Sequence, residues 1–355
     1  MRVLQLIDTL RPAGAERVAV NYANLLVSHV EKSFLCTTRG EGLLQQQLDD
    51  RVGYIYLQKR KRIDLIAFRK LNAFIVKNKI DVIHAHATSY FIGWIAKISN
   101  PKIQLIWHIH HGHYAKTASW KNSIYSLVSR SCCTIFTVND DLRTWALQHL
   151  KCKQVYYVKN FIVGASIKDN PKIPSLPGEE SKRIVCVANF RIEKNHGLLL
   201  DAFRQIKKEQ PQASLHLYGM SYDDIYSKSI QAIAAEIEQV YYHGLHPDLN
   251  ILLAHFNLGI LSSDSEGLPL ALLEYAQAAL PVVVTDVGQC REVISGYGCC
   301  VQAGSRDQLA QGMLFYLNNS DKAKNDGLAF KEHVVKSYGV NVVLNEVLKH
   351  YEACL

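Results

Sequence analysis

Short apolar runs alternate with segments of helical spacing in two separate stretches of the chain. In the first stretch the apolar runs occupy residues 2–7, 32–38, 81–86, 104–110 and 133–139. In the second stretch they occupy residues 183–189, 214–219, 240–244, 258–264 and 281–286. Buried strands that alternate with helices are typical of parallel sheets covered on both faces. The pattern therefore predicts an α/β protein with two parallel sheets.

Residues 163–183 separate the two stretches, and they are rich in Pro, Gly, Ser and charge without any periodic pattern. A chain of 355 residues also exceeds what one hydrophobic core usually supports. We therefore expect two doubly wound domains with a cleft between them. The expected boundaries are an N-terminal domain at 1–165, a linker at 166–182, a second domain at 183–338, and a C-terminal helix at 339–355 that packs back toward the N-terminal domain.

Positive charge is concentrated in the first half of the chain. Residues 1–178 carry a net charge of +14 and residues 179–355 carry −6, which gives +8 for the whole. The basic run KRKR at 59–62 is followed by an amphipathic helical pattern. Such a segment can lie on anionic lipid head groups, or it can be the solvated face of an ordinary helix.

The nine cysteines do not form a recognisable framework. Their number is odd, two pairs are adjacent doublets, and no C-x-x-C occurs. The sequence also lacks a secretory leader pattern and an apolar run of roughly 20 residues. These features predict reduced, mostly buried cysteines in a cytoplasmic protein, with peripheral membrane contact at most.

One stretch, SEGLPLALLEYAQAALPVVVTDVG at 265–288, carries two carboxylates in an otherwise apolar pattern. Pro269 suits the first turn of a helix, and Gly267 lets a ligand approach the backbone. The helix N-terminus is a natural site for phosphate. Glu266 and Glu274 stand on either side of this site, where carboxylates can accept hydrogen bonds from sugar hydroxyls. A nucleotide sugar has hydroxyls at both ends and a diphosphate between them.

This stretch resembles the E-x7-E signature of the retaining glycosyltransferases of family 4, which have the GT-B fold. The segments RPAGAE, DVIHAH, IWHIHHGH, VANFRIEKNHGLLLDAF and VYYHGL also resemble segments of that family, in the same order.

The resemblance implies a role for each matching residue. It implies that Glu266 contacts the transferred sugar and Glu274 contacts the ribose, while Gly267, Leu268 and Pro269 form the diphosphate loop. Lys194 would bind the leaving diphosphate. Asn189 occupies the place of the usual family Arg, and Arg191 is the candidate substitute. The remaining implied residues are Gly14 in the N-terminal loop, Gly244 and Leu245 at the base, and His110, with His108, His111 and His113 as alternatives, beside the transferred sugar.

No H-E-x-x-H or Cys/His framework supports a metal, so the expected enzyme uses neither metal nor other cofactor. We expect it to transfer a hexose or N-acetylhexosamine from a UDP-sugar, or from GDP-mannose, to a lipid-linked or oligosaccharide acceptor of bacterial surface polysaccharide synthesis. Two alternatives stay open: a non-catalytic subunit that binds a nucleotide sugar, and a glycosyltransferase that modifies nucleic acid. The basic first half motivates the latter, but no other feature favours a nucleic-acid partner.

Overall fold

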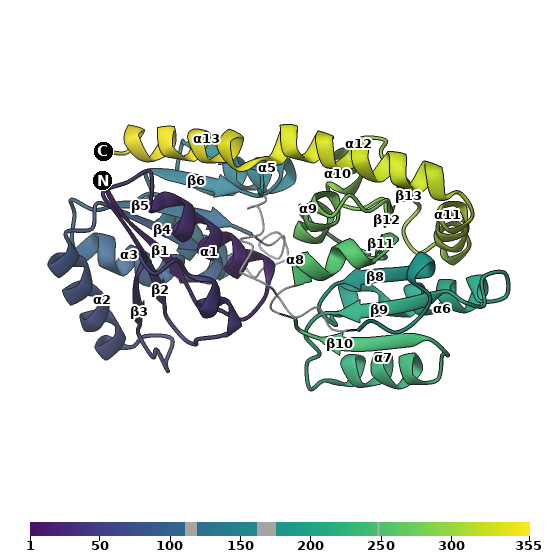
Figure 1. Cartoon of the computed structure of the whole chain (residues 1–355). Coiled ribbons are helices and arrows are strands. Elements are labelled where there is room, and N and C mark those ends of the chain that lie inside the picture. The colour runs from purple at the N-terminus through teal and green to yellow at the C-terminus, as the bar shows by residue number, and fades with distance from the viewer. Residues whose placement is uncertain (111–118, 162–174, 247–248) are drawn as a thin grey trace. The chain divides into compact units, whose positions relative to one another are not determined.

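The chain folds into two compact units, each built around its own sheet (Figure 1). The computed structural model describes residues 1–110, 119–161, 175–246 and 249–355. The first unit comprises Met1–Asn160 together with Val343–Leu355, and the second comprises Phe161–Val342. Residues 166–174 of the expected linker lie outside the described residues.

The first unit contains a seven-stranded parallel sheet in the order β3-β2-β1-β4-β5-β6-β7. Its strands are β1 (Arg2–Ile7), β2 (Lys32–Thr37), β3 (Gly53–Tyr56), β4 (Val82–His86), β5 (Gln104–Ile109), β6 (Thr134–Thr137) and β7 (Val155–Tyr157). Its helices are α1 (Gly14–Leu26), α2 (Leu65–Asn78), α3 (Tyr90–Ser99), α4 (Ser119–Ser129), α5 (Asp140–His149) and the C-terminal α13 (Val340–Ala353).

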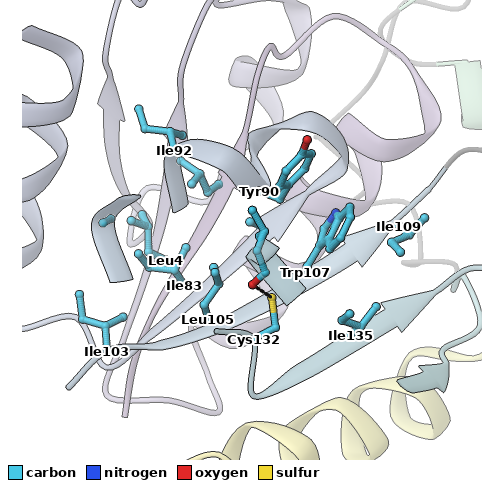
Figure 2. Packing of buried hydrophobic residues seen from close by; sticks show 14 of the residues in the cluster. Leu4, Ile83, Tyr90, Ile92, Ile103, Leu105, Trp107, Ile109, Cys132 and Ile135 are labelled. Carbon is cyan, nitrogen blue, oxygen red and sulfur yellow. Dashed lines mark hydrogen bonds between the residues drawn. The ribbon is translucent and has the colours of Figure 1, made fainter. Parts of the chain in front are cut away.

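The core of the first unit is aliphatic with an aromatic centre. Figure 2 shows aliphatic residues of neighbouring strands packed in one layer with Trp107 and Tyr90, whose ring centroids lie 4.5 Å apart. Leu4, Ile83 and Leu105 come from three adjacent strands and are fully buried. Because helices cover both sheet faces, these strands are buried along almost their whole length, and the polar side chains that they carry, such as Gln5 and His84, are buried as well.

The second unit contains a six-stranded parallel sheet in the order β10-β9-β8-β11-β12-β13. Its strands are β8 (Arg183–Val187), β9 (Ser214–Tyr218), β10 (Val240–Gly244), β11 (Leu258–Leu261), β12 (Val282–Thr285) and β13 (Cys299–Val301). Its helices are α6 (His196–Ile206), α7 (Ile225–Ala235), α8 (Leu249–Leu252), α9 (Leu270–Gln277), α10 (Cys290–Ile294), α11 (Arg306–Asn318) and α12 (Ser320–Tyr338).

These two sheets confirm the predicted fold class of two parallel-sheet α/β domains. Three strands were not predicted from the sequence, namely β3, β7 and β13. Each is a short strand of three or four residues at or beside a sheet edge, so its apolar run is too brief to stand out. The described part of the expected linker, 175–182, packs onto the second unit, because Arg183 donates hydrogen bonds to the carbonyls of Leu176, Pro177 and Gly178.

The C-terminal helix α13 packs against the first unit, beside β6 (Figure 1). Tyr351 on this helix is fully buried, and its hydroxyl lies 2.6 Å from Nδ1 of His84 on β4. The ring of His350 packs against Tyr156 of β7 at a tilt of 32°, with centroids 3.9 Å apart. The last turn of the chain is therefore part of the first unit's core.

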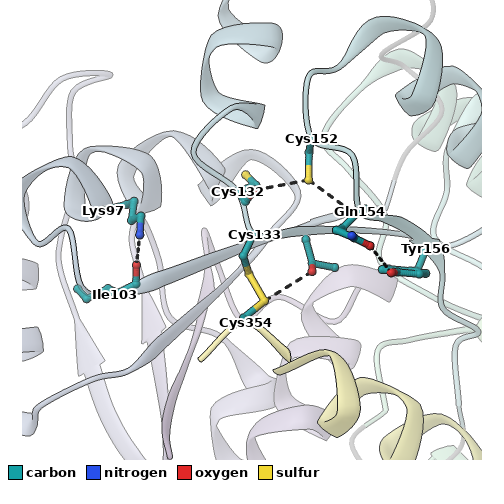
Figure 3. Close-up of a disulfide and its surroundings, with 9 residues drawn as sticks. Lys97, Ile103, Cys132, Cys133, Cys152, Gln154, Tyr156 and Cys354 are labelled. Atoms are coloured by element: carbon teal, nitrogen blue, oxygen red, sulfur yellow. Dashed lines mark hydrogen bonds between the residues drawn. A yellow bond between two sulfur atoms is a disulfide. The ribbon is translucent and has the colours of Figure 1, made fainter. Parts of the chain in front are cut away.

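The expectation that all cysteines are reduced is wrong for one pair. Figure 3 shows a disulfide between Cys133, just before β6, and Cys354, just after α13. The two residues are separated by 221 positions, and only the return of α13 brings them together, so spacing could not reveal the pair. Five of the other cysteines are buried, and Cys299 and Cys300 are partly exposed. Burial raises the pKa of thiols such as Cys186 and keeps them protonated.

Every helix among the described residues is too short or too polar to cross a lipid bilayer.

We predict that the disulfide anchors the end of α13. Reduction, or Cys354→Ser, should lower the stability of the first unit by about 2–4 kcal/mol, because the unfolded chain is no longer cross-linked. Thermal unfolding with and without reductant measures this, and Cys300→Ser is the control that should keep the full response to reductant. Quantitative alkylation of Cys354 in the unfolded, unreduced wild type would refute the pairing.

Candidate active site

Two neighbouring strands of the second sheet bring the main site residues together. Strands β8 and β11 are adjacent and parallel, so the loops that follow them leave the same edge of the sheet. Lys194 ends a short 3-10 turn in the loop after β8, and Glu266 lies in the loop after β11. The carboxyl edge of a parallel sheet is where ligands usually bind.

Lys194 and Glu266 form a tight ion pair. The Lys194 Nζ lies 2.7 Å from both carboxylate oxygens of Glu266, whose side chain is only 7% exposed. The hydroxyl of Ser263 donates a further 2.7 Å hydrogen bond to Oε1 of Glu266. This pair was not foreseen, because the sequence analysis assigned the two residues to different parts of a ligand. The ammonium can still donate to an incoming anion while the carboxylate balances its charge.

Several hydrogen bonds join the two loops and hold this pair in place. The side chain of Asn195 donates to both carboxylate oxygens of Asp264, at 3.0 and 3.1 Å. The backbone N–H of Asp264 donates to the carbonyl of Glu193 at 2.8 Å, and the hydroxyl of Ser262 donates to the carbonyl of Lys194. Asn195 also caps α6 by accepting from the N–H of Leu198, in a left-handed conformation that Asn tolerates. The loops therefore form one hydrogen-bonded layer.

The diphosphate loop residues lead directly into α9. Pro269 is extended and precedes the helix, which begins at Leu270. Leu268 and Pro269 are buried, so a ligand would meet their backbone rather than their side chains. The helix axis directs its positive end toward the edge where Lys194 lies, an arrangement that favours an anion.

Glu274 lies in α9 beside a buried anchor. The hydroxyl of the next residue, Tyr275, accepts a 2.7 Å hydrogen bond from the N–H of Val187 at the end of β8. Its ring covers Gly259 of β11, where a Cβ would lie 2.6 Å from the ring. This contact fixes the rotation of α9 about its axis. Half-buried Glu274 thus has a defined direction relative to Glu266.

Gly288 is a site residue that the sequence analysis missed. A Cβ at this position would overlap the carbonyl oxygen of Glu266 and approach that of Gly267 at 2.8 Å. Its φ of +52° also disfavours other residues. The N–H of the following Gln289 donates to the carbonyl of Gly267 at 3.0 Å. The loop after β12 therefore supports the Glu266 turn. The sequence feature that could have identified this residue is a glycine directly after the strand and the TDV run.

Arg191 does not join the Lys194–Glu266 pair. Its guanidinium donates to the hydroxyl of Tyr222 at 3.0 and 3.1 Å, and within the described chain no hydrogen bond or ion pair of this side chain reaches Lys194 or Glu266. Asn189 accepts a hydrogen bond from the N–H of Met220 at 2.8 Å. Among the described residues, no contact of the Arg191 side chain therefore supports the expectation that Arg191 replaces the usual family Arg.

The residues expected at the nucleotide base lie at the far end of the same edge. Gly244 ends β10 with a φ of +67°, and its carbonyl accepts from the N–H of Gly219 at 2.9 Å. Leu245 follows it and is partly exposed. Two strands, β9 and β8, lie between this position and β11.

The remaining predicted residues, Gly14 and His110, belong to the first unit. Gly14 is the first residue of α1, and Ala13 before it provides no side-chain cap. His110 directly follows β5 and is half-buried. His111 and His113 lie outside the described residues. His108 is buried and packs against His110 at a tilt of 30°, with ring centroids 4.1 Å apart.

A branched hydrogen-bond network starting at the buried amide of Gln5 reaches His110. The Oε1 of Gln5 lies 2.7 Å from Nε2 of His86, and Nδ1 of His86 lies 3.0 Å from Nε2 of His110. Because an amide oxygen only accepts, His86 must donate from Nε2 and accept at Nδ1. His110 then donates from Nε2, and in its neutral form Nδ1 is the acceptor nitrogen. The Gln5 orientation thus fixes the tautomer of His110.

The second branch leads away from His110. The Nε2 of Gln5 donates to the hydroxyl of Tyr351 at 3.3 Å, and that hydroxyl lies 2.6 Å from Nδ1 of His84. The Nε2 of His84 lies 3.2 Å from Nδ1 of His108. Burial holds the pKa values of His84, His86 and His108 well below the usual value of 6.5, so all three are neutral.

These three histidines could also be considered as metal ligands, since one nitrogen of each lies within 4.8 Å of the others. Of their ring nitrogens, however, only Nε2 of His108 has no hydrogen-bond partner. A shared metal would have to replace the hydrogen bonds described above. The network accounts for the histidines without a metal, and metal independence stays a prediction.

Comparison with known proteins extends these observations over the whole chain. The family model described as Glycosyltransferase Family 4 matches residues 12–163, and the model described as Glycosyl transferases group 1 matches residues 181–319. The O-antigen biosynthesis glycosyltransferase WbnH of Escherichia coli is 23% identical over 97% of each chain. The putative glycosyltransferase EpsF of Bacillus subtilis is 22% identical, over 80% of this chain and 79% of its own.

Solved structures share the fold. Anabaena HepE, determined with UDP and glucose, superposes with a TM-score of 0.82 at 16% identity, over 99% of this chain and all of its own. The lipopolysaccharide galactosyltransferase WaaB superposes with a TM-score of 0.67 over the full length of both chains. Since both halves match glycosyltransferase families and the two-sheet fold is shared along almost the entire length, the chain belongs to the GT-B glycosyltransferases.

Proposed function

We propose that the protein transfers a sugar from a UDP-sugar, with retention of configuration, to a hydroxyl of a lipid-linked glycan in bacterial surface polysaccharide synthesis. The observation that carries the proposal is the Lys194–Glu266 pair, 2.7 Å apart, beside the N-terminus of α9. It combines a cation for phosphate, a carboxylate for sugar hydroxyls and a helix dipole.

The donor and acceptor classes are supported by the names of related proteins. HepE was solved with UDP-glucose as well as with UDP, and WbnH is named for O-antigen biosynthesis. Two relatives at 22% identity are named serotype-specific mannosyltransferases, so GDP-mannose is the alternative donor. The transferred group would be a hexose or N-acetylhexosamine.

In the proposed reaction, the bond between the anomeric carbon and the diphosphate oxygen breaks, and the acceptor oxygen bonds to the same face of that carbon. The acceptor proton passes to the departing phosphate. Lys194 and the α9 N-terminus stabilise the negative charge that develops on the diphosphate. Glu266 holds sugar hydroxyls, Glu274 holds the ribose, and His110 accepts a hydrogen bond from the sugar at Nδ1. No metal is required at any of these steps.

A second candidate, a non-catalytic subunit that binds a nucleotide sugar, is favoured by one observation. Arg191 contacts Tyr222 instead of the Lys194–Glu266 pair, and Asn189 holds the backbone of Met220. The cationic support of the leaving group would then rest on Lys194 alone. Turnover distinguishes the candidates, because a subunit would bind donor without hydrolysing or transferring it.

Three substitutions in the second unit test the proposed roles. Lys194→Met and Glu266→Gln should each lower turnover about 10²–10³-fold, because the first removes the cation that stabilises the departing diphosphate and the second weakens the hydrogen bonds that hold the sugar. Glu274→Ala should chiefly weaken UDP affinity, by about ten- to a hundredfold for lost charged hydrogen bonds. Calorimetric UDP titration and donor turnover measure these effects.

The matched control for this series is Lys228→Met, which removes an exposed lysine paired with Asp223 in the same unit. This substitution should change neither UDP affinity nor donor turnover. Full transfer activity in both Glu266→Gln and Glu274→Ala would show that the site is elsewhere.

Gly288→Ala tests the support of the Glu266 turn. The added methyl would collide with the Glu266 carbonyl, so the turn must move, and UDP affinity should fall at least tenfold while the fold is kept. Gly304→Ala is the matched control, since Gly304 also has a positive φ of +75° but open space around it. Equal losses of affinity in the two variants would attribute the effect to backbone strain alone.

The hydrogen-bond network around Gln5 predicts different consequences for its two branches. His86→Phe removes the partner that fixes His110, so the His110 tautomer should become mixed and turnover should fall about five- to tenfold, the value of one hydrogen bond. Tyr351→Phe breaks only the other branch and should leave both the His110 tautomer and the turnover unchanged. Nitrogen-15 NMR of labelled histidines reports the tautomer. A His110 signal that stays the same in His86→Phe would refute the network's role.

A further inference from the structure

A cavity of about 300 Å³ opens in the first unit, within the described residues and apart from the histidine network. Its polar wall is formed by Asp8, Arg39, Lys59, Arg62 and Thr88. This volume is at the small end of the range for ligand sites in proteins.

The polar wall follows directly from the strand order. Asp8 comes after β1, Arg39 after β2, Lys59 after β3 and Thr88 after β4. These are four neighbouring parallel strands, so their loops converge at one carboxyl edge. The cavity therefore occupies the position in the first sheet where open parallel sheets bind ligands.

The cavity carries an excess of positive charge. Three cations face a single carboxylate, that of Asp8, which already accepts hydrogen bonds from the hydroxyls of Thr38 and Thr88. The Arg39 Nε approaches Asp8 only to 3.9 Å. Lys59 makes no ion pair with any residue in the described part of the chain. Burial and the neighbouring Arg39 lower the pKa of Lys59, and the carboxylates of Asp8 and Asp64 only partly offset this effect.

The rest of the lining is mostly apolar and aromatic. Phe91, Ile124 and Tyr125 belong to it, together with Tyr90, whose ring packs on Trp107 (Figure 2). Next to Arg62 in the sequence, Ile63, Leu65 and Ile66 are 67%, 66% and 80% exposed. A ligand that fits both parts of the lining has an anionic group attached to a sugar ring or a hydrocarbon.

We propose that this cavity binds the phosphate or diphosphate ester of the acceptor. Paired guanidinium and ammonium groups are the usual partners of phosphate oxygens, and the aromatic wall would hold the adjoining group. The inference rests on the proposed function, because it names the acceptor's chemistry. The ester can belong to a polyprenyl lipid or to a water-soluble sugar phosphate, and the two share the same anion.

The binding test titrates inorganic pyrophosphate into the full-length protein with UDP at saturation, so that the second unit's phosphate site is occupied. Lys59→Met and Arg62→Gln should each weaken pyrophosphate binding at least tenfold and leave UDP affinity unchanged. Lys61→Met is the matched control, because Lys61 has the same charge in the same segment but does not line the cavity.

Two outcomes of this titration overturn the proposal: unchanged pyrophosphate affinity in Lys59→Met, or an equal loss in Lys61→Met, which would indicate a diffuse charge effect. If UDP does not bind the wild type, the proposed function fails, and the same variants titrated without UDP still decide the anion site.

The transfer test identifies the source of the phosphate. Polyprenyl diphosphate-linked sugar in detergent and the corresponding soluble sugar phosphate are offered as acceptors to the wild type and to Lys59→Met. The acceptor KM should rise at least tenfold in the variant, with donor hydrolysis unchanged, for whichever ester is the substrate. If only the polyprenyl-linked sugar is glycosylated, the acceptor is lipid-linked. If the soluble sugar phosphate is glycosylated equally well, the acceptor is a water-soluble sugar phosphate. An equally good acceptor without any phosphate would overturn the proposal.

Discussion

The ion pair between Lys194 and Glu266 is the interaction on which the site of the second unit depends. It exists because β8 and β11 are neighbours in the sheet although 72 positions separate the two residues. Placing a lysine against a carboxylate avoids an isolated charge and orients both groups before a ligand arrives. An ammonium held in this way needs little reorganisation when diphosphate charge develops, which is the condition for effective electrostatic stabilisation.

Three further features act through this pair. The Asn195–Asp264 contact joins the loops, Gly288 supports the Glu266 turn, and Tyr275 anchors α9 to the end of β8. None of them is expected to touch a ligand. Together they fix the positions of Lys194 and Glu266 relative to the strands of the sheet.

The first unit uses its own sheet edge differently. At one place the amide of Gln5 sets the proton positions of a buried histidine network, to which the C-terminal helix contributes Tyr351. At another place four strand ends surround a cationic cavity. The first arrangement depends on neutral, desolvated rings, and the second on charges that remain partly hydrated. The network joins side chains of β1, β4 and β5, whereas the cavity is lined by residues that follow the ends of β1, β2, β3 and β4. The Cys133–Cys354 disulfide fastens the helix that completes the network.

The sequence predicted the two sheets and the Glu266-to-Glu274 segment because both are local patterns. Short apolar runs bounded by polar residues reveal most of the strands, and one Gly-Leu-Pro turn flanked by two carboxylates reveals a ligand loop. The Lys194–Glu266 pair, the Gln5 network and the disulfide could not be predicted, since each joins residues that only the folded sheets bring together. Gly288 is visible in the sequence as a glycine after a strand. Its role, however, depends on the carbonyl that faces it, and that contact cannot be predicted from the sequence.

A structure of the protein with a bound UDP-sugar tests the central claim most directly. The account predicts that the diphosphate lies at the N-terminus of α9, with an oxygen within hydrogen-bond distance of Lys194 Nζ, and that Glu266 and Glu274 contact the sugar and the ribose respectively. A nucleotide bound elsewhere, with Lys194 and Glu266 still paired and remote from it, would contradict the account.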